Sequence, residues 1–300
     1  LHYPLRRQRQ MCIRDSADLE ATGMNLRLDT LATSINVDGR TLTVRDAAGT
    51  ESTIAYDELM VGTGASPSTA GIAGLDQLGP DDGVHLLHSM GDTFALERYL
   101  DEHQPETAII VGAGYVGLEM AEALTVRGLH VTQLQRGPEV LSTLDPELGS
   151  LVREELTRHG VDVLTGTRVD AVTRDAGRLT VTGIRDGDTF SRSADLVLVV
   201  VGVRPNTSLL TAAGAATGAG GAVVVDEHMR TGLPNVWAAG DGVVTHHRLL
   251  GVTYLPLGTT SHKQGRVAGE NAIGGNARFA GSLGTQVVKL SLIHISEPTR

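Results

Sequence analysis

The fold is decided by the stretch Ala108-Ile109-Ile110-Val111-Gly112-Ala113-Gly114-Tyr115-Val116-Gly117. Its apolar first half predicts a buried parallel strand, and its second half has the G-x-G-x-x-G spacing of a dinucleotide-binding loop. Gly112 permits the tight turn, Gly114 lets a pyrophosphate approach the backbone, and Gly117 lets helix and strand pack closely. A helix over 115–127 follows, whose N-terminal N–H groups would attract phosphates. An ordinary glycine turn is the alternative, but the flanking strand and helix favour dinucleotide binding.

The elements after this loop complete a doubly wound domain. We predict strands at Val131–Leu134 and Val161–Leu164, with a helix between them that Asp145-Pro146 opens. The apolar residues of that helix have helical spacing: Leu148, Leu151, Val152 and Leu156. A β meander over 168–189 and an apolar strand, Leu196–Val201, follow. This order predicts an α/β dinucleotide-binding domain with a parallel sheet over residues 105–222.

The segments on either side of this domain also have α/β character. Before it, the sequence predicts strands at Leu26–Leu28, Ala32–Val37, Thr41–Val44 and Leu59–Val61, and a helix from Asp92, its cap, to Glu102. After it, we predict strands at Val223–Val225 and Val236–Ala239, and a helix over Thr259–Asn271. Leu59–Pro67 and Leu196–Pro205 are both apolar strands that end in a glycine turn and a proline. This similarity suggests two related sheet halves, one interrupted by the other.

Length and composition exclude several classes of protein. A chain of 300 residues suggests two domains of ordinary size. The net charge of −10 argues against a nucleic-acid partner or an anionic membrane. No apolar run approaches the roughly 20 residues of a membrane span, and no secretory signal opens the chain, so we expect a cytoplasmic protein. One cysteine rules out a disulfide framework.

Both ends of the chain look foreign. Met11-Cys12-Ile13-Arg14-Asp15-Ser16 and Leu290-Ser291-Leu292-Ile293-His294-Ile295 can be encoded by the two strands of one short DNA. The pair resembles the mosaic end of a transposon-based sequencing adapter; a natural basic tail is the alternative. We therefore expect residues 1–16 and 290–300, and with them Cys12, to be non-native.

The choice between NADH and NADPH depends on the residues that end the second strand of the domain. An acidic residue there accepts hydrogen bonds from the ribose 2′-hydroxyl, whereas an arginine pairs with a 2′-phosphate. This chain has Gln135-Arg136 at that point. Gln135 cannot supply a carboxylate, and Arg136 either reaches a phosphate or faces solvent. The pair favours tolerance of NADPH.

Ordered motifs cover nearly the whole interior of the chain. They are Tyr56-Asp57-Glu58-Leu59-Met60-Val61-Gly62-Thr63-Gly64-Ala65, Gly112–Gly117 followed by Leu118-Glu119-Met120-Ala121-Glu122, Val201-Gly202-Val203-Arg204-Pro205-Asn206, and Asn235-Val236-Trp237-Ala238-Ala239-Gly240-Asp241. With them, residues 17–289 resemble the FAD-dependent pyridine nucleotide-disulfide oxidoreductases. The branch of CoA-disulfide reductases, NADH oxidases and NADH peroxidases is indicated by His246-His247-Arg248 and Leu255-Pro256-Leu257-Gly258-Thr259-Thr260.

The resemblance implies a flavoprotein fold with two dinucleotide-binding domains, the NAD(P) domain being inserted in an FAD domain that is truncated at its N-terminus. The FAD domain would comprise residues 17–104 and 223–275, and the NAD(P) domain residues 105–222. Residues 276–289 would begin a dimerisation domain that is cut short, so the intact parent is expected to be a homodimer.

Roles for particular residues follow from the same resemblance. Thr63 and Gly64 would line the flavin side of the FAD cleft. Asp241, after Gly240, would hydrogen-bond the ribityl-phosphate chain. A further group is implied in the cofactor sites: Gly202, and Leu257, Gly258 and Thr259, which place a helix N-terminus at the flavin pyrimidine edge.

Two residues of the helix after the glycine loop are implied in the chemistry itself. Tyr115 would cover the flavin ring as a gate, and Glu119 would lie near the nicotinamide. The alternative for Tyr115 is a packed aromatic ring, and the alternative for Glu119 is a solvated helix face.

Gly62 and Gly242 depart from the family, which often has an apolar residue or cysteine there.

The implied reaction passes a hydride from NAD(P)H to FAD and then electrons to a small-molecule acceptor: a CoA-type disulfide, dioxygen or peroxide. The family's N-terminal unit, with the first glycine motif and the redox cysteine, is not found. We therefore expect the chain to form the NAD(P) domain without retaining FAD. Two alternatives stay open: a ferredoxin- or rubredoxin-reductase-like flavoprotein, which needs no cysteine, and a nucleotide-binding redox sensor without turnover.

Two other kinds of site find little support in the sequence. The histidines His246, His247 and His262 have no cysteine or carboxylate spacing that would complete a metal site. A serine hydrolase would need a G-x-S-x-G turn between strand and helix, which the sequence lacks. We expect no metal.

Overall fold

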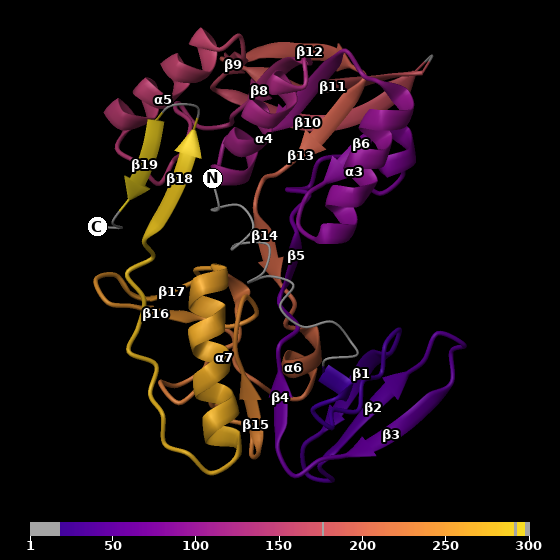
Figure 1. The fold of residues 1–300 in the computed structure, drawn as a ribbon, viewed down its shortest axis with the longest axis vertical. Coiled ribbons are helices and arrows are strands. Elements are labelled where there is room, and N and C mark those ends of the chain that lie inside the picture. The colour runs from indigo at the N-terminus through magenta and orange to yellow at the C-terminus, as the bar shows by residue number, and fades with distance from the viewer. Residues whose placement is uncertain (1–18, 176, 291–292, 298–300) are drawn as a thin grey trace.

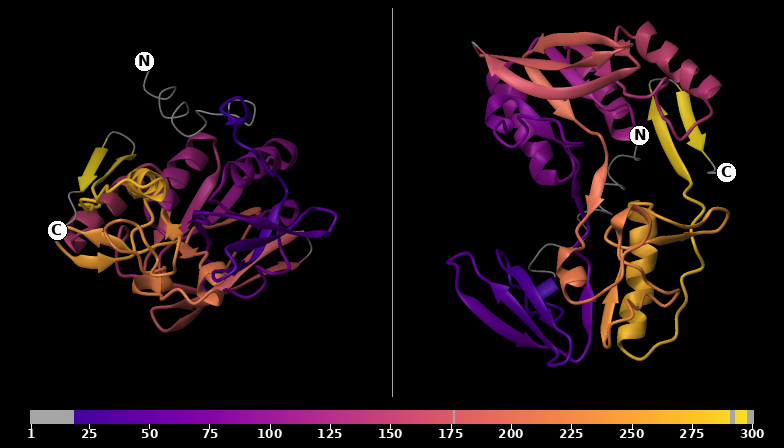
Figure 2. Two further views of the ribbon diagram at one scale, coloured as in Figure 1. Left: turned by 90° about the horizontal axis from the view of Figure 1, so that it is seen from below. Right: turned by 180° about the vertical axis from the view of Figure 1, so that it is seen from behind.

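The computed structural model describes residues 19–290 and 293–297, apart from residue 176. The chain forms two lobes (Figure 1). The upper lobe contains the long helices α3 (Met90–His103), α4 (Tyr115–Val126) and α5 (Pro146–Arg158), and the lower lobe contains α7 (Gly258–Ala272). The view from behind shows the same division, with only thin connections between the lobes (Figure 2).

The upper lobe is built on a five-stranded parallel sheet of order β6-β13-β7-β8-β9. Its strands are β6 (Val84–Leu86), β13 (Leu196–Val199), β7 (Thr107–Val111), β8 (His130–Leu134) and β9 (Asp162–Leu164). Alternate residues of β7 belong to different cores: Ala108 and Ile110 pack against the helices, whereas Ile109 and Val111 pack on the other face. Burial on both faces explains why β7 is apolar without alternation.

A three-stranded antiparallel meander covers the second face of this sheet. It comprises β10 (Thr167–Asp175), β11 (Arg178–Arg185) and β12 (Asp188–Ala194). Val172, Leu179 and Val181 are buried against the parallel strands. The turn Asp186-Gly187 has positive φ at both residues, as a two-residue hairpin requires. The meander lies where the sequence predicts it and extends to Ala194.

The lower lobe joins segments from both sides of the upper lobe. β4 (Leu59–Val61) pairs in parallel with β15 (Val236–Ala238), although the whole upper lobe separates them in sequence. A three-stranded antiparallel sheet of β1 (Leu31–Asn36), β2 (Thr41–Arg45) and β3 (Glu51–Ala55) lies beside them. The predicted interruption of one sheet half by the other is therefore confirmed.

Short elements complete the chain. They are the helical turns η1 (Pro80–Asp82), α6 (Ser208–Ala212) and η2 (Ala219–Gly221), and the hairpins of β16 (Thr245–His247) with β17 (Gly251–Thr253) and of β18 (Gln286–Leu290) with β19 (Ile293–Glu297). The second hairpin spans the predicted boundary between residues 289 and 290.

The two lobes are linked by two strands that run from one lobe to the other, β5 (Ala65–Pro67) and β14 (Val203–Pro205). These strands pair antiparallel, and we call this pair the crossing. Asn206 fastens this crossing. Its side-chain Nδ2 donates to the carbonyl of Thr63 at 3.0 Å, and its Oδ1 accepts from Ser66 Oγ at 2.9 Å. The Thr63 hydroxyl in turn donates to the Asn206 carbonyl at 2.7 Å.

Several predicted elements are wrong in detail. Leu26–Leu28 is not a strand, and Leu28 is exposed with no neighbouring strand. Val223–Val225 is not a strand either, because only Val223 makes isolated bridges, to Thr217 and Val243. The strand expected to end at Val201 ends at Val199.

Two helices also differ from their predicted details. The cap of α3 is Ser89, whose side chain accepts from the Asp92 N–H, while the Asp92 carboxylate accepts from Ser89 N–H in return. In α5, Val152 and Leu156 are buried, but Leu148 and Leu151 are about half exposed.

Candidate functional site

The glycine loop lies at a strand-to-helix corner between β7 and α4, where the sequence places it. Gly112 has φ of 107°, and a Cβ there would lie 2.5 Å from the Val200 carbonyl oxygen. A Cβ on Gly117 would lie 2.1 Å from the Gly112 oxygen. Only glycine fits either position. Gly114, the N-cap of α4, faces open space instead, which leaves room for a ligand to approach the backbone.

The first two turns of α4 hold the two residues implied in the chemistry. Tyr115 is half-buried, and its hydroxyl lies 3.4 Å from Thr143 Oγ1. Glu119 is exposed one turn further along the helix. The first helical hydrogen bond runs from Leu118 N–H to the Gly114 carbonyl, so the amides before it have no acceptor within the helix. The positive end of α4 is thus directed at the open side of the loop.

Gln135 and Arg136 follow β8 and differ in where they point. The Gln135 amide lies under the glycine loop: its Oε1 accepts from Ala113 N–H and its Nε2 donates to the Glu139 carbonyl, both at 3.2 Å. Both ends of this side chain are therefore used within the protein. Arg136 is exposed. The guanidinium of Arg136 is therefore available to a ligand, whereas the amide of Gln135 is not.

The second glycine turn, Gly240-Asp241-Gly242, lies against the N-terminus of α7. Asp241 Oδ1 accepts a hydrogen bond of 2.6 Å from Ser261 Oγ, and Gly240 N–H donates to Gln264 Oε1 at 3.1 Å. Leu257 is the N-cap of α7, and Gly258 and Thr259 are its exposed first residues. The carboxylate of Asp241 and the positive end of α7 thus lie close together.

Tyr254 closes the back of this turn. Its hydroxyl donates to the Asp241 carbonyl oxygen at 3.0 Å. Burial, helped by the negative charge of Asp241, raises the pKa of Tyr254 to about 12. The phenol therefore stays protonated at neutral pH and serves as a fixed donor.

Thr63 and Gly64 lie beside the second glycine turn. A Cβ on Gly242 would lie 3.4 Å from the Gly64 oxygen and 3.7 Å from Thr63 Oγ1. Gly202 lies at the other side of the crossing: it is exposed, has φ of 103°, and its carbonyl accepts from Ser68 N–H at 2.8 Å. The crossing strands therefore connect turns from both lobes.

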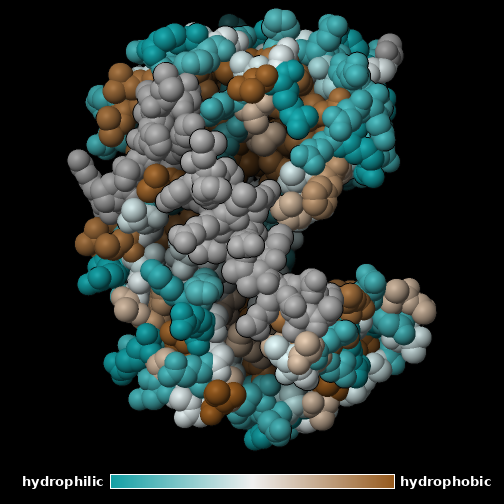
Figure 3. Space-filling view, viewed as in Figure 1, coloured by the Kyte–Doolittle hydropathy of each residue, from teal (hydrophilic) through white to brown (hydrophobic). Residues whose placement is uncertain are grey.

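The topology makes the two glycine turns face one another. β13 leads down into β14 and the crossing, so the carboxyl edge of the parallel sheet, including the end of β7, faces the lower lobe (Figure 1). β4 leads up into β5, so the carboxyl ends of β4 and β15 face the upper lobe. The space-filling view shows a hollow between the lobes on one side (Figure 3). Ligands of open parallel sheets bind at such carboxyl edges.

Both turns fit parts of dinucleotides. The loop at Gly112–Gly117 has the close approach, the open space and the helix end that a pyrophosphate needs. The turn at Asp241 supplies one carboxylate and one helix end. Among the described residues, the turn at Asp241 and the end of α7 thus offer contacts for one portion of an FAD molecule. The pyrophosphate loop lies in the upper lobe and is of the NAD(P) type.

Sequence reasoning missed three polar side chains that support these turns: Gln133, Ser261 and Gln264. Their only signal is position, since Gln133 interrupts the apolar strand β8, and Ser261 and Gln264 are three apart on α7. A further missed residue is Glu58, whose carboxylate accepts from Asn235 Nδ2 and Trp237 Nε1, each at 2.6 Å. These bonds lower the pKa of Glu58, that from Trp237 most.

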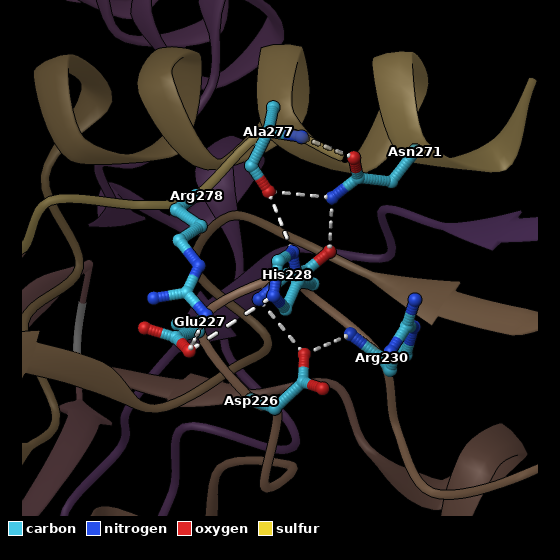
Figure 4. Close-up of polar contacts among 7 residues, drawn as sticks. All are labelled: Asp226, Glu227, His228, Arg230, Asn271, Ala277 and Arg278. Atoms are coloured by element: carbon cyan, nitrogen blue, oxygen red, sulfur yellow. Dashed lines mark hydrogen bonds and ion pairs between the residues drawn. The ribbon is translucent and has the colours of Figure 1, made fainter. Parts of the chain in front are cut away.

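A separate polar cluster orders the chain after α7 (Figure 4). Asn271 donates to the carbonyls of His228 and Ala277, and it accepts from Ala277 N–H at 2.6 Å. His228 Nδ1 lies 2.8 Å from the Ala277 carbonyl and must carry a proton there. Asp226 Oδ1 accepts from the N–H groups of His228 and Arg230, and Glu227 pairs with Arg278 at 3.1 Å. These contacts hold residues 226–230 and 277–278 against α7.

Two further features concern the described residues alone. No group of three or more histidine, cysteine, aspartate or glutamate side chains is arranged to hold a metal ion there. No helix in the same part of the chain is long and apolar enough to cross a membrane.

Comparison with known proteins settles the family. The profile of the pyridine nucleotide-disulphide oxidoreductases matches residues 6–265. The chain belongs to this family. The NAD(P)H sulfur oxidoreductase (CoA-dependent) of Pyrococcus abyssi is 33% identical over 289 residues, which cover 93% of this chain and 60% of the relative. The chain thus spans about three-fifths of the length of such relatives.

Solved structures of the family share the fold. The NAD-dependent persulfide reductase from A. fulgidus superposes with a TM-score of 0.87 at 33% identity, covering 95% of this chain and 52% of that one. An engineered water-forming NADPH oxidase bound to NADPH has a TM-score of 0.85 at 27% identity, covering 94% of this chain and 61% of that one. The predicted oxidoreductase family and α/β fold class are confirmed.

Proposed function

We propose that this chain is the NAD(P)H-binding part, with a portion of the flavin site, of an FAD-dependent NAD(P)H oxidoreductase. The observation that carries the proposal is the placement of Gly112–Gly117 and Gly240–Gly242 on sheet edges that face each other across the crossing strands. Such an arrangement suits two dinucleotides that must meet ring to ring.

The residues of the chain would divide the work between binding and orientation. Gly114 and the N-terminus of α4 would hold the pyrophosphate of NAD(P)H, with Tyr115 and Glu119 toward the nicotinamide. Asp241, kept in place by Ser261, would accept hydrogen bonds from the flavin side chain. The N-terminus of α7 would stabilise negative charge at the flavin edge. FAD supplies the acceptor of the hydride when it is bound.

The electron acceptor we propose is a small molecule: a CoA-type disulfide or persulfide, dioxygen or peroxide. Relatives of this chain are described as CoA-dependent sulfur oxidoreductase, coenzyme A disulfide reductase and NADH oxidase. Because such an enzyme draws on the NAD(P)H pool, we place it in the cytoplasm and expect the intact protein to be a homodimer.

A reductase that passes electrons to a protein such as a ferredoxin is the second candidate. It is favoured by the likeness of the chain to one solved reductase of this kind. Putidaredoxin reductase, in its complex with putidaredoxin, superposes with a TM-score of 0.82 at 25% identity.

The acceptor is tested by NAD(P)H consumption, followed at 340 nm, with FAD added to the purified chain and to a version extended by the upstream gene. Each receives CoA disulfide, oxygenated buffer, hydrogen peroxide or a ferredoxin. Consumption with the first three supports the main proposal, and consumption with ferredoxin alone favours the second candidate. Binding of NAD(P)H without consumption under any condition would leave a redox sensor as the function.

We further propose that Arg136 makes the site accept NADPH. Its exposed guanidinium follows a position without a carboxylate. The engineered NADPH oxidase replaces an aspartate and the alanine after it by alanine and arginine, whereas the Lactobacillus brevis enzyme without these changes was solved with NADH. The same two features, no acid and an arginine, are native here.

The test is titration of the chain with NADPH and NADH, followed by nucleotide fluorescence. Arg136→Ala is expected to weaken NADPH about tenfold and to leave NADH unchanged, since only NADPH carries the 2′-phosphate. Arg127→Ala, at the opposite end of α4, is the control. Equal loss for both nucleotides would contradict the assignment of Arg136 to the 2′-phosphate.

A further inference from the structure

The Gly112–Ala113 segment of the dinucleotide loop is anchored at every polar group of its backbone. Gly112 N–H donates to the Leu134 carbonyl at 2.8 Å, and the Ala113 carbonyl accepts from Leu141 N–H at 2.9 Å. Side chains take the other two groups: Gln133 Nε2 donates to the Gly112 carbonyl at 2.8 Å, and Gln135 Oε1 accepts from Ala113 N–H. Gln133 lies on β8 and Gln135 follows directly after its end. Together they hold the loop from beneath.

Gln133 is a costly residue to have at this place. Its side chain is fully buried, on a strand with a parallel neighbour on each side. Its Oε1 has no hydrogen-bond partner in the described part of the chain. A buried amide oxygen without a partner destabilises a fold, whereas an apolar side chain of similar volume would not. Stability therefore does not account for Gln133, and its bond to the Gly112 carbonyl is the contact that distinguishes it from leucine.

That bond lies at the corner where strand, loop and helix meet. A Cβ on Gly117 would lie 2.1 Å from the Gly112 oxygen and 2.8 Å from Gln133 Nε2, so all three groups are in close contact. Fixing the Gly112 carbonyl fixes the plane of the peptide that leads into Ala113. Gly112 and Gly114 allow a wide range of backbone angles, so they do not fix the direction of the loop by themselves. The direction of the next amides, at Gly114 and Val116, therefore depends on how the plane of this peptide is held.

We infer that Gln133 is a positioning residue for the pyrophosphate of NAD(P)H, acting through the Gly112 carbonyl, with Gln135 as its partner on Ala113. The inference rests on the proposed function, in which this loop binds the dinucleotide. The unpartnered Oε1 of Gln133 makes the fold less stable. The bond from its Nε2 keeps the loop amides in the geometry that the ligand needs. Gln135, predicted as a direct cofactor contact, contributes in the same indirect way.

The test is the substitution Gln133→Leu, which keeps the volume and removes the donor. The variant is expected to melt close to the temperature of the unchanged chain, because the loss of the unpartnered Gln133 Oε1 offsets the loss of the donor to the Gly112 carbonyl. It is also expected to bind NADPH about three to ten times more weakly, because the loop loses its anchor. A merely structural role predicts the opposite pattern, with lower stability and unchanged affinity.

Two probes separate the pyrophosphate from the rest of the ligand. Affinity for 2′-phospho-ADP-ribose, which has the bridging pyrophosphate, should fall with that for NADPH, whereas affinity for adenosine 2′-monophosphate should not change. Thr132→Val is the matched control, because Thr132 is buried on the other face of the same strand. It should bind all three ligands as the unchanged chain does.

The outcomes distinguish the inference from the proposed function. If the unchanged chain binds neither NADPH nor NADH, the proposed function fails. If it binds and Gln133→Leu binds equally well, the role of Gln133 is overturned. Should Gln133→Leu not fold, as circular dichroism would show, Gln133→Met provides the same test with a more flexible side chain of equal length.

Discussion

At the scale of single residues, His85 is a buried titratable group that the site does not use. It lies on β6 with 1% of its surface exposed, its ring edge-on to Tyr99, and its Nε2 has no partner among the described residues. Burial lowers its pKa from 6.5 to about 4, although the charges of Asp92 and Asp81 oppose the shift. The folded protein therefore holds His85 neutral at pH values where the unfolded chain protonates it.

The sign of the pH dependence follows from this. At His85, unfolding takes up a proton between pH 6.5 and about 4. The contribution of His85 to stability therefore falls as the pH drops through that window and is constant above it. His85→Phe keeps the ring against Tyr99 and cannot titrate. We expect the variant to lose on the order of 2 kcal/mol less than the unchanged chain between pH 7.5 and 4.5, as measured by urea unfolding. His130→Phe, at an exposed site on β8, should keep the original slope.

Residues divide sharply in how far the sequence predicts them. Gly112 and Gly117 were predictable because the contacts that exclude a Cβ come from their own strand–loop–helix unit. Gln133 and Asn206 were not, because their partners are chosen by the packing of the lobe and by the crossing of two distant strands. Gln135 was predicted at the right loop, but its amide turns inward to Ala113, a choice of rotamer that sequence does not specify.

At the scale of elements, the pairing of β4 with β15 depends on Glu58. Its carboxylate accepts from Asn235 and Trp237 at the start of β15, and the pKa of Glu58 is lowered by both bonds. Glu58→Gln keeps the size but removes the charge that strengthens these bonds. We expect it to destabilise the lower lobe by about 1 kcal/mol and to change the emission of Trp237, the only tryptophan of the chain.

The matched control is Glu51→Gln on β3, where the ion pair with Arg45 is about half exposed on both sides. Such a pair contributes little to stability, so this variant should unfold like the unchanged chain. Unaltered tryptophan emission and unfolding in Glu58→Gln would mean that backbone pairing alone holds β15.

Elements were predictable where local signals define both their ends. α5 begins at Pro146 after Asp145, and α7 begins at Gly258 after its N-cap Leu257. Both helices lie within two residues of their predicted bounds. Leu26–Leu28 and Val223–Val225 failed for a different reason. A strand needs a neighbour to pair with, and three alternating apolar residues do not reveal whether one is present.

At the scale of the whole molecule, Asn206 is the residue that ties the lobes at their crossing. Asn206→Ala removes the bonds to the Thr63 carbonyl and to Ser66 Oγ, while the backbone pairing of β5 and β14 stays. We expect proteolytic cleavage within residues 62–68 and 202–207 to become about two- to tenfold faster, as followed by mass spectrometry. Asn206→Asp, which keeps the acceptor for Ser66, should lie in between, and equal rates in all three proteins would show that the strands alone hold the crossing.

The same narrow connection implies that the lobes differ in their response to ligand. The dinucleotide loop belongs entirely to the upper lobe, whereas Trp237 belongs to the lower lobe, on β15. The lobes are joined by a pair of short strands and by β18, which rises from the lower lobe and contacts α4. Lobes joined by so few elements are expected to unfold in separate steps. At a concentration of 100 times its Kd, 2′-phospho-ADP-ribose stabilises the state that binds it by about 2.7 kcal/mol.

Only the upper lobe should gain that stability. For a domain of this size we expect its melting transition, followed by circular dichroism, to rise by about 10 °C, while the transition followed by Trp237 fluorescence stays in place. The probe has no absorption that would quench tryptophan emission, so the two readings are independent. A joint rise of both transitions would contradict separate unfolding. It would mean that the crossing at Asn206 couples the lobes, so that ligand bound to the upper lobe also stabilises the lower lobe. With Asn206→Ala the two transitions would then separate, because that substitution removes the side-chain bonds through which the lobes are coupled.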